Sequence, residues 1–505
     1  MWIVIPAWSV PDSVCSVRPF GIMGLVQLRI FYLRGIQGMP LAGFRGFGLT
    51  FRNHLIYEYE GLSSGSDCPA EASTLSVPGL LSCVILLLCL FQAVNAATLV
   101  VAAGDSSATS KLHADYICDG ISDQQEIQAA INAVSSSGGG TIVLSEGTFA
   151  LSSSLSLQND CVLEGRGVEN TLITLSKKAA IFISPSVQGV TLENFKAVGE
   201  GCILIEGDHV RLHDITMTTG DTIDGAFRIM CTKDKPVIQD IEFINCSAID
   251  CGCIGFINSA SQSVASSAWV KDIRYTDCVV VNYGLSSRYN PWVCGFDLAE
   301  LCSVDGMIVD GCYAEGNWES GFHFEPTTIR NVVLKDCISK NNAQKTAITG
   351  ETCHFGAGFF TNGDVTLLNC TSSGTHRRGF MIRGGVVNAT LVDCRDIGAV
   401  NSFDLSNVDG VVLENCVSEN PTSTGFFIYA STNITQINCS VNPASSAQSP
   451  VSNVFAIEFP KKLEIFPLLR SLCRIFSFGN LPIYLCHGVC LIDYTPRYPL
   501  TDPQL

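Results

Sequence analysis

One dipeptide recurs along the second half of this chain: an Asn or Asp followed directly by a Cys, which ends a short run of alternating apolar and polar residues. A turn-forming Asn, Asp or Gly lies six positions before each of these Cys. Alternation is typical of a half-buried β-strand, and these turn formers tolerate tight backbone bends. The repeated pairs are Asn245-Cys246, Asp277-Cys278, Asp336-Cys337, Asn369-Cys370, Asp393-Cys394, Asn415-Cys416 and Asn438-Cys439, with Gly311-Cys312 as a variant. The chain therefore repeats one strand-and-turn unit.

A second column, of Phe residues that usually follow a Gly, runs in step with the first. Its members are Phe256, Phe296, Phe322, Phe359, Phe380, Phe403 and Phe426. The last three are 23 residues apart. This length suits one coil of a parallel β-solenoid, where equivalent positions on successive coils stack about 4.8 Å apart. We therefore predict an all-β fold, a right-handed parallel β-helix with the Cys and Phe columns facing inward.

The composition fits a large folded domain and argues against general nucleic-acid binding. Of the 505 residues, 47% are hydrophobic and only 15% are charged, so the chain can bury a substantial core. The net charge is −17, and the sequence has no Lys- or Arg-rich tract to neutralise phosphates. We expect no nucleic-acid partner.

Two groups stand out among the 24 cysteines. Eight repeat at one inward position, where a free Cys acts as a small buried hydrophobe. Five others lie off this ladder and are the better candidates for disulfides: Cys251, Cys253, Cys294, Cys302 and Cys353. The segment Cys251-Gly252-Cys253 resembles a metal motif, but no His follows at a matching spacing, so we predict no metal site.

Four regions follow along the chain. Residues 1–79 show no sustained period and stay unassigned. Residues 80–97 hold a 12-residue apolar run, too short to span a bilayer, and then small residues at positions that a signal peptidase reads. We therefore expect an extracellular or cell-surface protein with no transmembrane span in the mature chain. Residues 98–449 form the predicted β-helix, and residues 450–505 lose both columns and stay unassigned.

Residues 118–151 predict a helix followed by a strand. Four apolar residues recur at helical spacing: Ile127, Ala130, Ile131 and Val134. Ser122 and Asp123 can cap the first turn, and three glycines at 138–140 end the helix. Placed just before the first coil, such an amphipathic helix covers the open end of a solenoid, which otherwise exposes unpaired strand edges.

This block resembles the opening of the pectate lyase superfamily, whose members begin with an acidic turn, an AIQxAI helix, a Gly-rich turn and a strand ending in GTY or GTF. Residues 100–120, VVAAGDSSATSKLHADYICDG, further resemble secreted β-helix proteins from methanogenic archaea. The resemblance covers residues 98–442. It implies three strands per coil, with the V-x-L-x-N-C runs as second strands and the Gly-Phe runs as first strands, on which family members bind glycans.

The resemblance is specific for architecture and not for reaction type, because the superfamily holds lyases, hydrolases, epimerases and non-catalytic surface proteins. The chain lacks the paired DD of the polygalacturonases and the RxPxxR of the pectate lyases, and Gly321-Phe322-His323 does not match the family's catalytic histidine segment. Several lyases of the family use calcium, which makes it a candidate cofactor here, although no compact Asp-rich loop is present.

The Phe column predicts which residues face outward. Period-two alternation turns Asp297 and His323 outward, while Ala299 and Glu325 share the next outward column. Asp297, His323 and Glu325 thus fall on two adjacent rungs and are the candidate catalytic residues. The candidate substrate-binding residues lie on the same face or in the loops beside it: Arg288, Tyr289, Trp292, Trp318, His354, Arg377, Arg378, Arg383 and Asp404.

Two chemistries fit this set. Asp297 and Glu325 should lie about 8 Å apart, within the range of roughly 6.5 to 9.5 Å expected for the carboxylates of an inverting glycoside hydrolase. Alternatively, the Arg-rich stretch at 376–385 would neutralise a uronate carboxylate, so that His323 or Tyr289 acts as the base in β-elimination or C5 epimerisation. Surface Asp, Glu and Arg are also often simply solvated. A non-catalytic surface-layer or adhesive β-helix is therefore the second hypothesis, and in both a polysaccharide is the partner.

The repeated Asn is expected to be buried, with its side-chain amide bonded to neighbouring rungs at Asn369, Asn415 and Asn438. The sequons at 369–371 and 438–440 should then escape glycosylation, whereas the turn residues Asn388 and Asn433 are open to it.

Overall fold

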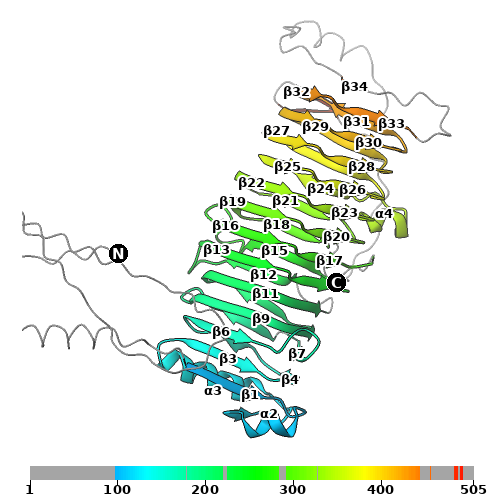
Figure 1. Ribbon diagram of the computed structural model, residues 1–505. Coiled ribbons are helices and arrows are strands. Elements are labelled where there is room, and N and C mark those ends of the chain that lie inside the picture. The colour runs from blue at the N-terminus through cyan, green and yellow to red at the C-terminus, as the bar shows by residue number, and fades with distance from the viewer. Residues whose placement is uncertain are drawn as a thin grey trace, which may run out of the picture. The chain divides into compact units, whose positions relative to one another are not determined.

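The computed structural model describes residues 97–177, 179–219, 225–283, 292–326 and 328–443, and three short strands after them. In the described part, the chain winds as a right-handed parallel β-helix whose coils stack along one axis (Figure 1). Each complete coil contributes three strands, so equivalent strands of successive coils pair into three parallel sheets. We call these the first, second and third sheet in the order in which the chain visits them.

The bounds of the elements follow the three sheets. The first sheet contains β5 (Leu155–Ser156), β8 (Ala180–Ile183), β10 (Cys202–Ile205), β12 (Gly225–Cys231), β15 (Ile254–Ala260), β18 (Phe296–Glu300), β21 (Phe322–Glu325), β24 (Ala357–Thr361), β31 (Thr424–Tyr429) and β34 (Phe455–Ala456). The second contains β1 (Ala97–Ala102), β3 (Gly140–Leu144), β6 (Cys161–Glu164), β13 (Val237–Ile244), β16 (Trp269–Thr276), β19 (Ser303–Asp310), β22 (Ile329–Lys335), β25 (Val365–Leu368) and β32 (Thr432–Ile437).

The third sheet contains β4 (Gly147–Leu151), β7 (Thr171–Leu175), β14 (Ser247–Ile249), β17 (Val279–Val281), β20 (Tyr313–Glu315), β23 (Ile338–Lys340), β26 (Thr371–Ser373), β28 (Arg395–Ile397), β30 (Val417–Glu419) and β33 (Ser440–Asn442). Four long strands run through a bend into the next sheet: β9 (Gln188–Gly199), β11 (Asp208–Thr219), β27 (Arg378–Val392) and β29 (Asn401–Glu414). Strand β2 (Tyr116–Ile117) pairs with β1, and β35 (Ile483–Cys486) pairs with β36 (Val489–Ile492).

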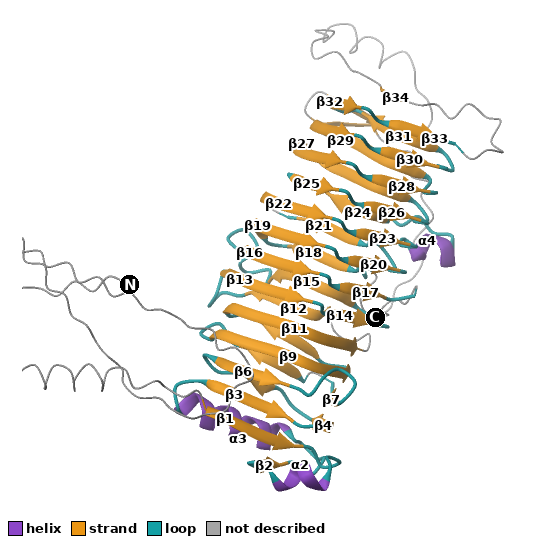
Figure 2. Ribbon diagram, in the orientation of Figure 1, coloured by secondary structure: helices purple, strands orange, loops and turns teal. Residues whose placement is uncertain are grey.

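Three short helices accompany the strands in the described part (Figure 2): α2 (Ala108–Leu112), α3 (Gln124–Ser136) and α4 (Gln344–Thr349). Helix α3 lies at the N-terminal end of the solenoid and buries its four predicted apolar residues, which confirms the expected cap. Asp123 is its N-cap residue, but its side chain does not cap the helix. Its two oxygens instead accept the N–H groups of Gly120 (2.8 Å) and Ala150 (2.7 Å), which ties the helix start to β4.

The predicted Phe column is confirmed as one continuous stack inside the first sheet, and Phe227 extends it by one coil. Successive ring centroids lie 4.6 to 4.9 Å apart with nearly parallel planes. A Gly precedes most of these Phe residues and leaves room for the neighbouring coil, because a Cβ at Gly321 would meet the Gly358 carbonyl oxygen at 2.8 Å. Each Gly-Phe pair thus lets two backbones approach closely while the ring fills the core.

The Cys ladder is also confirmed. Seven of its eight members are fully buried, and Cys439, on the last coil, is half-buried. The ladder thiols also bond between coils. The Cys370 thiol, for example, donates to the Leu334 carbonyl of the preceding coil at 3.6 Å. The expectation of disulfides off the ladder is wrong: the five candidate cysteines, Cys251, Cys253, Cys294, Cys302 and Cys353, are buried and unbridged to any described cysteine.

The repeated Asn or Asp lies at the bend between the second and third sheets, in the left-handed backbone conformation that the turn requires. At Asn369, φ is 51° and the side-chain amide donates to the Asp336 carboxylate of the preceding coil at 2.7 Å. The bonds between rungs are therefore present, but the predicted burial is wrong, because Asn369, Asn415 and Asn438 point outward and are exposed. Burial thus gives no reason for the sequons at 369 and 438 to escape glycosylation.

Replacing Asn369 by Ala should lower the free energy of unfolding by about 1–2 kcal/mol, because a Cβ-bearing residue without a local hydrogen bond is strained in the left-handed region. Asn369→Gly keeps the backbone conformation and loses only the amide, so it should cost less. Urea unfolding of the two variants measures the difference. Equal losses for Ala and Gly would contradict a role of backbone strain.

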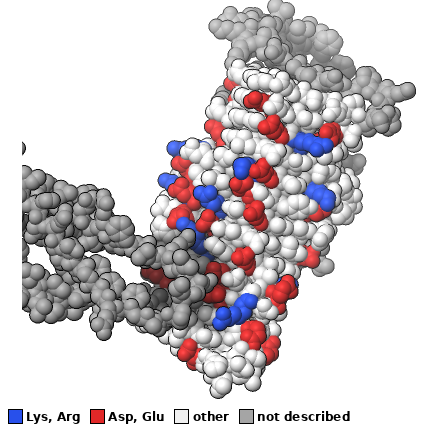
Figure 3. Space-filling model, in the orientation of Figure 1, with Lys and Arg blue, Asp and Glu red and all other residues white. Residues whose placement is uncertain are grey.

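Charged residues on the outer face link neighbouring coils. On the face seen in Figure 3, acidic and basic side chains intermingle along the stacked coils, and pairs such as Lys340–Glu315 (3.1 Å) and Arg395–Glu419 (2.5 Å) connect adjacent rungs. None of the described helices is long and apolar enough to cross a membrane. Residues 1–79 and the signal-like apolar run lie outside the described residues, and the bounds of the four regions stay predictions.

A candidate active-site cavity

A cavity of about 600 Å³ opens on the outer side of the first sheet, over four successive rungs from β12 to β21. Strand residues of these rungs form its floor, and the segments just before β18 and after α4 supply Trp292 and Phe355 to its rim. The residues that line it are Met230, Ile254, Ile257, Ser259, Ala260, Trp292, Cys294, Asp297, Glu300, Leu301, Glu319, His323, Glu325 and Phe355. All three predicted catalytic residues are among them.

A β-bulge in β18 changes which side chains share a register. Asp297 pairs with His323 as predicted, but the partner of Glu325 is Glu300 and not Ala299. The extra residue leaves Leu298 and Ala299 both buried and turns Glu300 toward the cavity. The sequence did not predict Glu300. Strict alternation places the next outward residue two positions after Asp297, at Ala299, whereas the bulge places it three positions after, at Glu300.

His323 lies deep in the cavity wall. It is only 4% exposed, and its ring packs against Phe360 (centroids 4.5 Å apart) and Phe355 (5.8 Å). Its Nε2 faces the Glu325 carboxylate at 3.5 Å, while its Nδ1 is buried without a hydrogen-bond partner among the described residues. The imidazole is therefore held in place by aromatic packing and one carboxylate.

Four carboxyl groups surround this single imidazole, and their exposure differs. Asp297 and Glu319 are buried, Glu300 is half-buried, and Glu325 is exposed. Burial raises the pKa of Asp297 to about 7, although the nearby His323 lowers it. Burial likewise raises the pKa of Glu300 and of Glu319. The side chains that a ligand in the cavity reaches most directly are Glu300 and Glu325.

The pKa of His323 reflects opposing influences. Burial lowers it, but the contact with Glu325 and the charges of Asp297 and Glu319 raise it, and the net shift is upward. An imidazole so surrounded favours its charged form, as expected for a histidine between carboxylates.

The predicted substrate-binding residues are only partly brought together. Trp292 lies exposed at the cavity, with its ring 6.4 Å from that of Phe355. Trp318 is half-buried and His354 is exposed, and neither lines the cavity. Arg288 and Tyr289 lie outside the described residues.

The predicted Arg residues and Asp404 form a second group, on the rungs of β27 and β29. Arg378 and Asp404 are both buried and form an ion pair, with the guanidinium Nε 2.5 Å from the carboxylate. Arg378 also donates to the His354 carbonyl (3.2 Å). Arg377 and Arg383 are half-buried, and burial together with the Arg378 charge lowers the pKa of each. One carboxylate thus faces three guanidinium groups, which leaves this group net positive.

Comparisons with known proteins give structural likeness only. No protein-family model matches this chain, and no curated protein matches it. Among solved structures, it is similar to the A-module of mannuronan C-5 epimerase AlgE4 from Azotobacter vinelandii, with 14% identity over 65% of this chain and 95% of that one and a TM-score of 0.35. It is also similar to an alginate lyase from Paenibacillus sp., with 14% identity over 68% of this chain and 99% of that one and a TM-score of 0.33.

A third similar structure is ORF18 of Geobacillus virus E2, with 15% identity and a TM-score of 0.37. The match covers 64% of this chain and 59% of that one, so this chain spans about three fifths of the length of the viral protein. The resemblance to archaeal proteins stays a prediction.

Proposed function

We propose that this chain is a secreted carbohydrate-active enzyme that cleaves an acidic polysaccharide in the cavity on its first sheet. The observation that carries the proposal is the register of Glu300 and Glu325, which lie opposite one another on adjacent rungs and both line the cavity. Exposed Trp292 at the rim offers a flat apolar surface for a sugar ring. The signal-like segment at residues 80–97 supports the extracellular location in this proposal.

Hydrolysis is the reaction that two such carboxyl groups serve most directly. One protonates the glycosidic oxygen of the leaving sugar, while the other accepts a proton from the attacking water or adds to the sugar itself. Glu325, the more exposed of the two, has free access to a bound chain. Asp297 and His323, which the sequence places at the centre of the site, lie beneath this pair and support its orientation.

β-Elimination is the second candidate, and the Arg group favours it. A lyase must neutralise a uronate carboxylate before a base removes the neighbouring proton. Arg377 and Arg383, on rungs further along the same sheet, offer guanidinium groups that Asp404 does not pair. Planar guanidinium groups bind carboxylates with two parallel hydrogen bonds, so this group suits a uronate unit of the same polysaccharide chain.

Incubating the purified full-length chain with a panel of uronate-containing and neutral polysaccharides tests the proposal. New reducing ends alone indicate hydrolysis, and new reducing ends with ultraviolet absorbance of an unsaturated uronate indicate elimination. Glu325→Gln and Glu300→Gln should each lower the rate by ~10² to 10⁴-fold. Glu414→Gln is the matched control, because this half-buried Glu lies on β29, away from the cavity.

Binding to a polysaccharide without any cleavage across the panel would overturn the enzymatic proposal. It would favour the second hypothesis, a non-catalytic surface or adhesive β-helix.

A further inference from the structure

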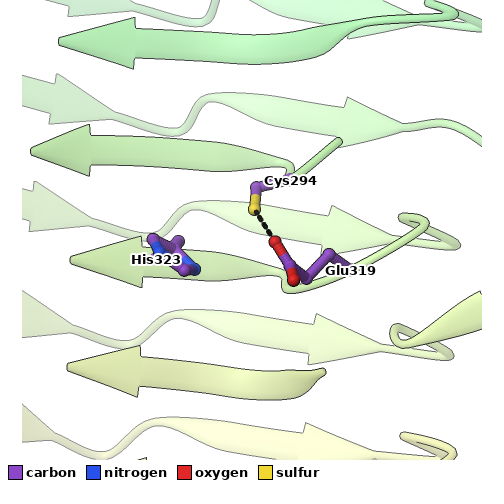
Figure 4. Close-up of side chains that lie close together, drawn as sticks. All are labelled: Cys294, Glu319 and His323. Carbon is purple, nitrogen blue, oxygen red and sulfur yellow. Dashed lines mark hydrogen bonds between the residues drawn. The ribbon is translucent and has the colours of Figure 1, made fainter. Parts of the chain in front are cut away.

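Three buried side chains of different chemistry line the cavity and lie close together (Figure 4). Cys294 precedes β18, Glu319 lies in the loop before β21, and His323 is on β21 itself. The Cys294 sulfur, one Glu319 carboxylate oxygen and one His323 ring nitrogen all lie within 4.8 Å of one another. Cys294 Sγ is 3.5 Å from Glu319 Oε2, the contact drawn in the figure.

This set of donor atoms matches a particular class of metal ion. Thiolate, imidazole and carboxylate together suit a borderline-soft ion such as Zn²⁺, whereas Ca²⁺ needs six to eight oxygen ligands. With bonds of about 2.0 to 2.3 Å, tetrahedral zinc ligands lie ~3.4 to 3.8 Å apart. The present spacing needs side-chain shifts of about 1 Å or less to reach that arrangement.

A second observation points to a missing partner at the same place. His323 Nδ1 and Asp297 Oδ1 are buried polar atoms without a hydrogen-bond partner among the described residues, although both side chains are at least 95% buried. Leaving such atoms unpaired is costly, and native structures rarely do so.

The simpler reading is that the thiol of Cys294 only donates a weak hydrogen bond to Glu319. That interpretation does not account for the buried, unpaired His323 Nδ1. A comparable cluster near the N-terminal cap, at Cys118, Asp123 and Glu126, differs because both Asp123 oxygens already accept backbone N–H groups. The cavity cluster alone therefore carries the inference.

We propose that Cys294, Glu319 and His323 bind one Zn²⁺ ion whose fourth coordination position faces the cavity. All three ligands line the cavity, and a site with three protein ligands and one open position is the arrangement of catalytic zinc. The Cys353 thiol donates to Glu319 Oε1 at 3.7 Å, which helps to orient that carboxylate. Binding displaces the thiol proton of Cys294 and the proton on the coordinating nitrogen of the charged His323, and both are released to solvent.

Metal binding is measured without any sugar, so its outcome is separate from that of the proposed function. The full-length chain, stripped with a chelator under reducing conditions, should bind one zinc that resists dialysis and should release protons as zinc is added. Cobalt in place of zinc should give an intense thiolate-to-metal charge-transfer band and the visible absorption of a tetrahedral ion.

Three variants and one control assign the site. Cys294→Ser, Glu319→Gln and His323→Gln should each weaken zinc binding by at least ~10-fold, and Cys294→Ser should abolish the charge-transfer band. Cys302→Ser is the matched control, because this Cys is equally buried and lies outside the cluster. Circular dichroism of each variant verifies folding. Absence of stoichiometric zinc in the parent chain, or a band that Cys294→Ser retains, would overturn the proposal.

Discussion

Replacing His323 by Gln should lower the rate of polysaccharide cleavage by ~10² to 10⁴-fold, the loss expected when a group that organises proton transfer is removed. The reason is geometric, because His323 lies between Asp297 and Glu325 on adjacent rungs and contacts the Glu325 carboxylate at 3.5 Å. Initial rates on the substrate identified in the panel measure the effect. Gln is chosen over Ala because the ring is buried against Phe355 and Phe360.

The control for this variant must lie off the cavity. Met230 is an outward residue of the first sheet, but it lines the cavity and is unsuitable. His213→Gln changes the same residue type at a half-buried position on β11 and should leave the rate unchanged. If His323→Gln keeps full activity while folded, the reaction takes place elsewhere, and His354 with the Arg377 group becomes the place to look.

In the parent chain, the free energy of unfolding should fall by up to about 4 kcal/mol as the pH rises from about 4 to above 7, because Asp396 loses a proton that the folded state holds. Replacing Asp396 by Asn should remove this loss. Asp396 is on β28 and fully buried, and burial raises its pKa from 3.8 to about 7. One oxygen accepts the Ala399 N–H at 3.3 Å, while the other has no hydrogen bond of normal geometry, although the Ser372 and Ser402 hydroxyls lie nearby. The folded chain therefore holds the proton more tightly than the unfolded chain does.

The sign of the pH effect follows from that difference. Below pH 3.8 both states are protonated, and the full stability is present. As the pH rises from there to about 7, the unfolded state loses its proton first, so the free energy of unfolding falls. Asp396→Asn should be more stable than the parent above pH 7 and similar to it near pH 4. The control is Asp393→Asn, at an exposed turn position of the same coil, and parallel curves for the parent and Asp396→Asn would contradict the prediction.

The columns in the sequence were enough to predict the β-helix, because each reports a position that repeats on every coil. The inward position of the Phe and Cys columns is predicted correctly wherever the alternation holds. The spacing of the apolar residues correctly predicts helix α3 and its buried face. The Asn column shows the limit of this reasoning. Its residues do bond between rungs, but a side chain at a bend can point outward and still make that bond, so periodicity alone does not predict burial.

The site was predicted less completely, for two physical reasons. A single bulge in β18 shifts the count by one residue, which hides Glu300 and wrongly turns Ala299 outward. Cys294, Glu319 and Cys353 come from loops, whose positions depend on packing against neighbouring rungs and follow no repeat. Alternation also predicts which face of the sheet a side chain is on, but not how exposed it is. Asp297 and His323 do face outward from the sheet, yet they are buried because the rim of the cavity covers them.

The ladder of reduced thiols makes the coils from Cys246 to Cys416 separately observable. A buried thiol reacts with a labelling reagent only when its coil opens, so the labelling rate of each ladder Cys reports the opening free energy of its own rung. Equivalent thiols run from Cys246 to Cys416, each fully buried in the same environment. Differences in their rates therefore reflect local stability rather than chemistry. Mass spectrometry of labelled peptides would show along the axis whether this solenoid unravels from its ends or opens first around the cavity.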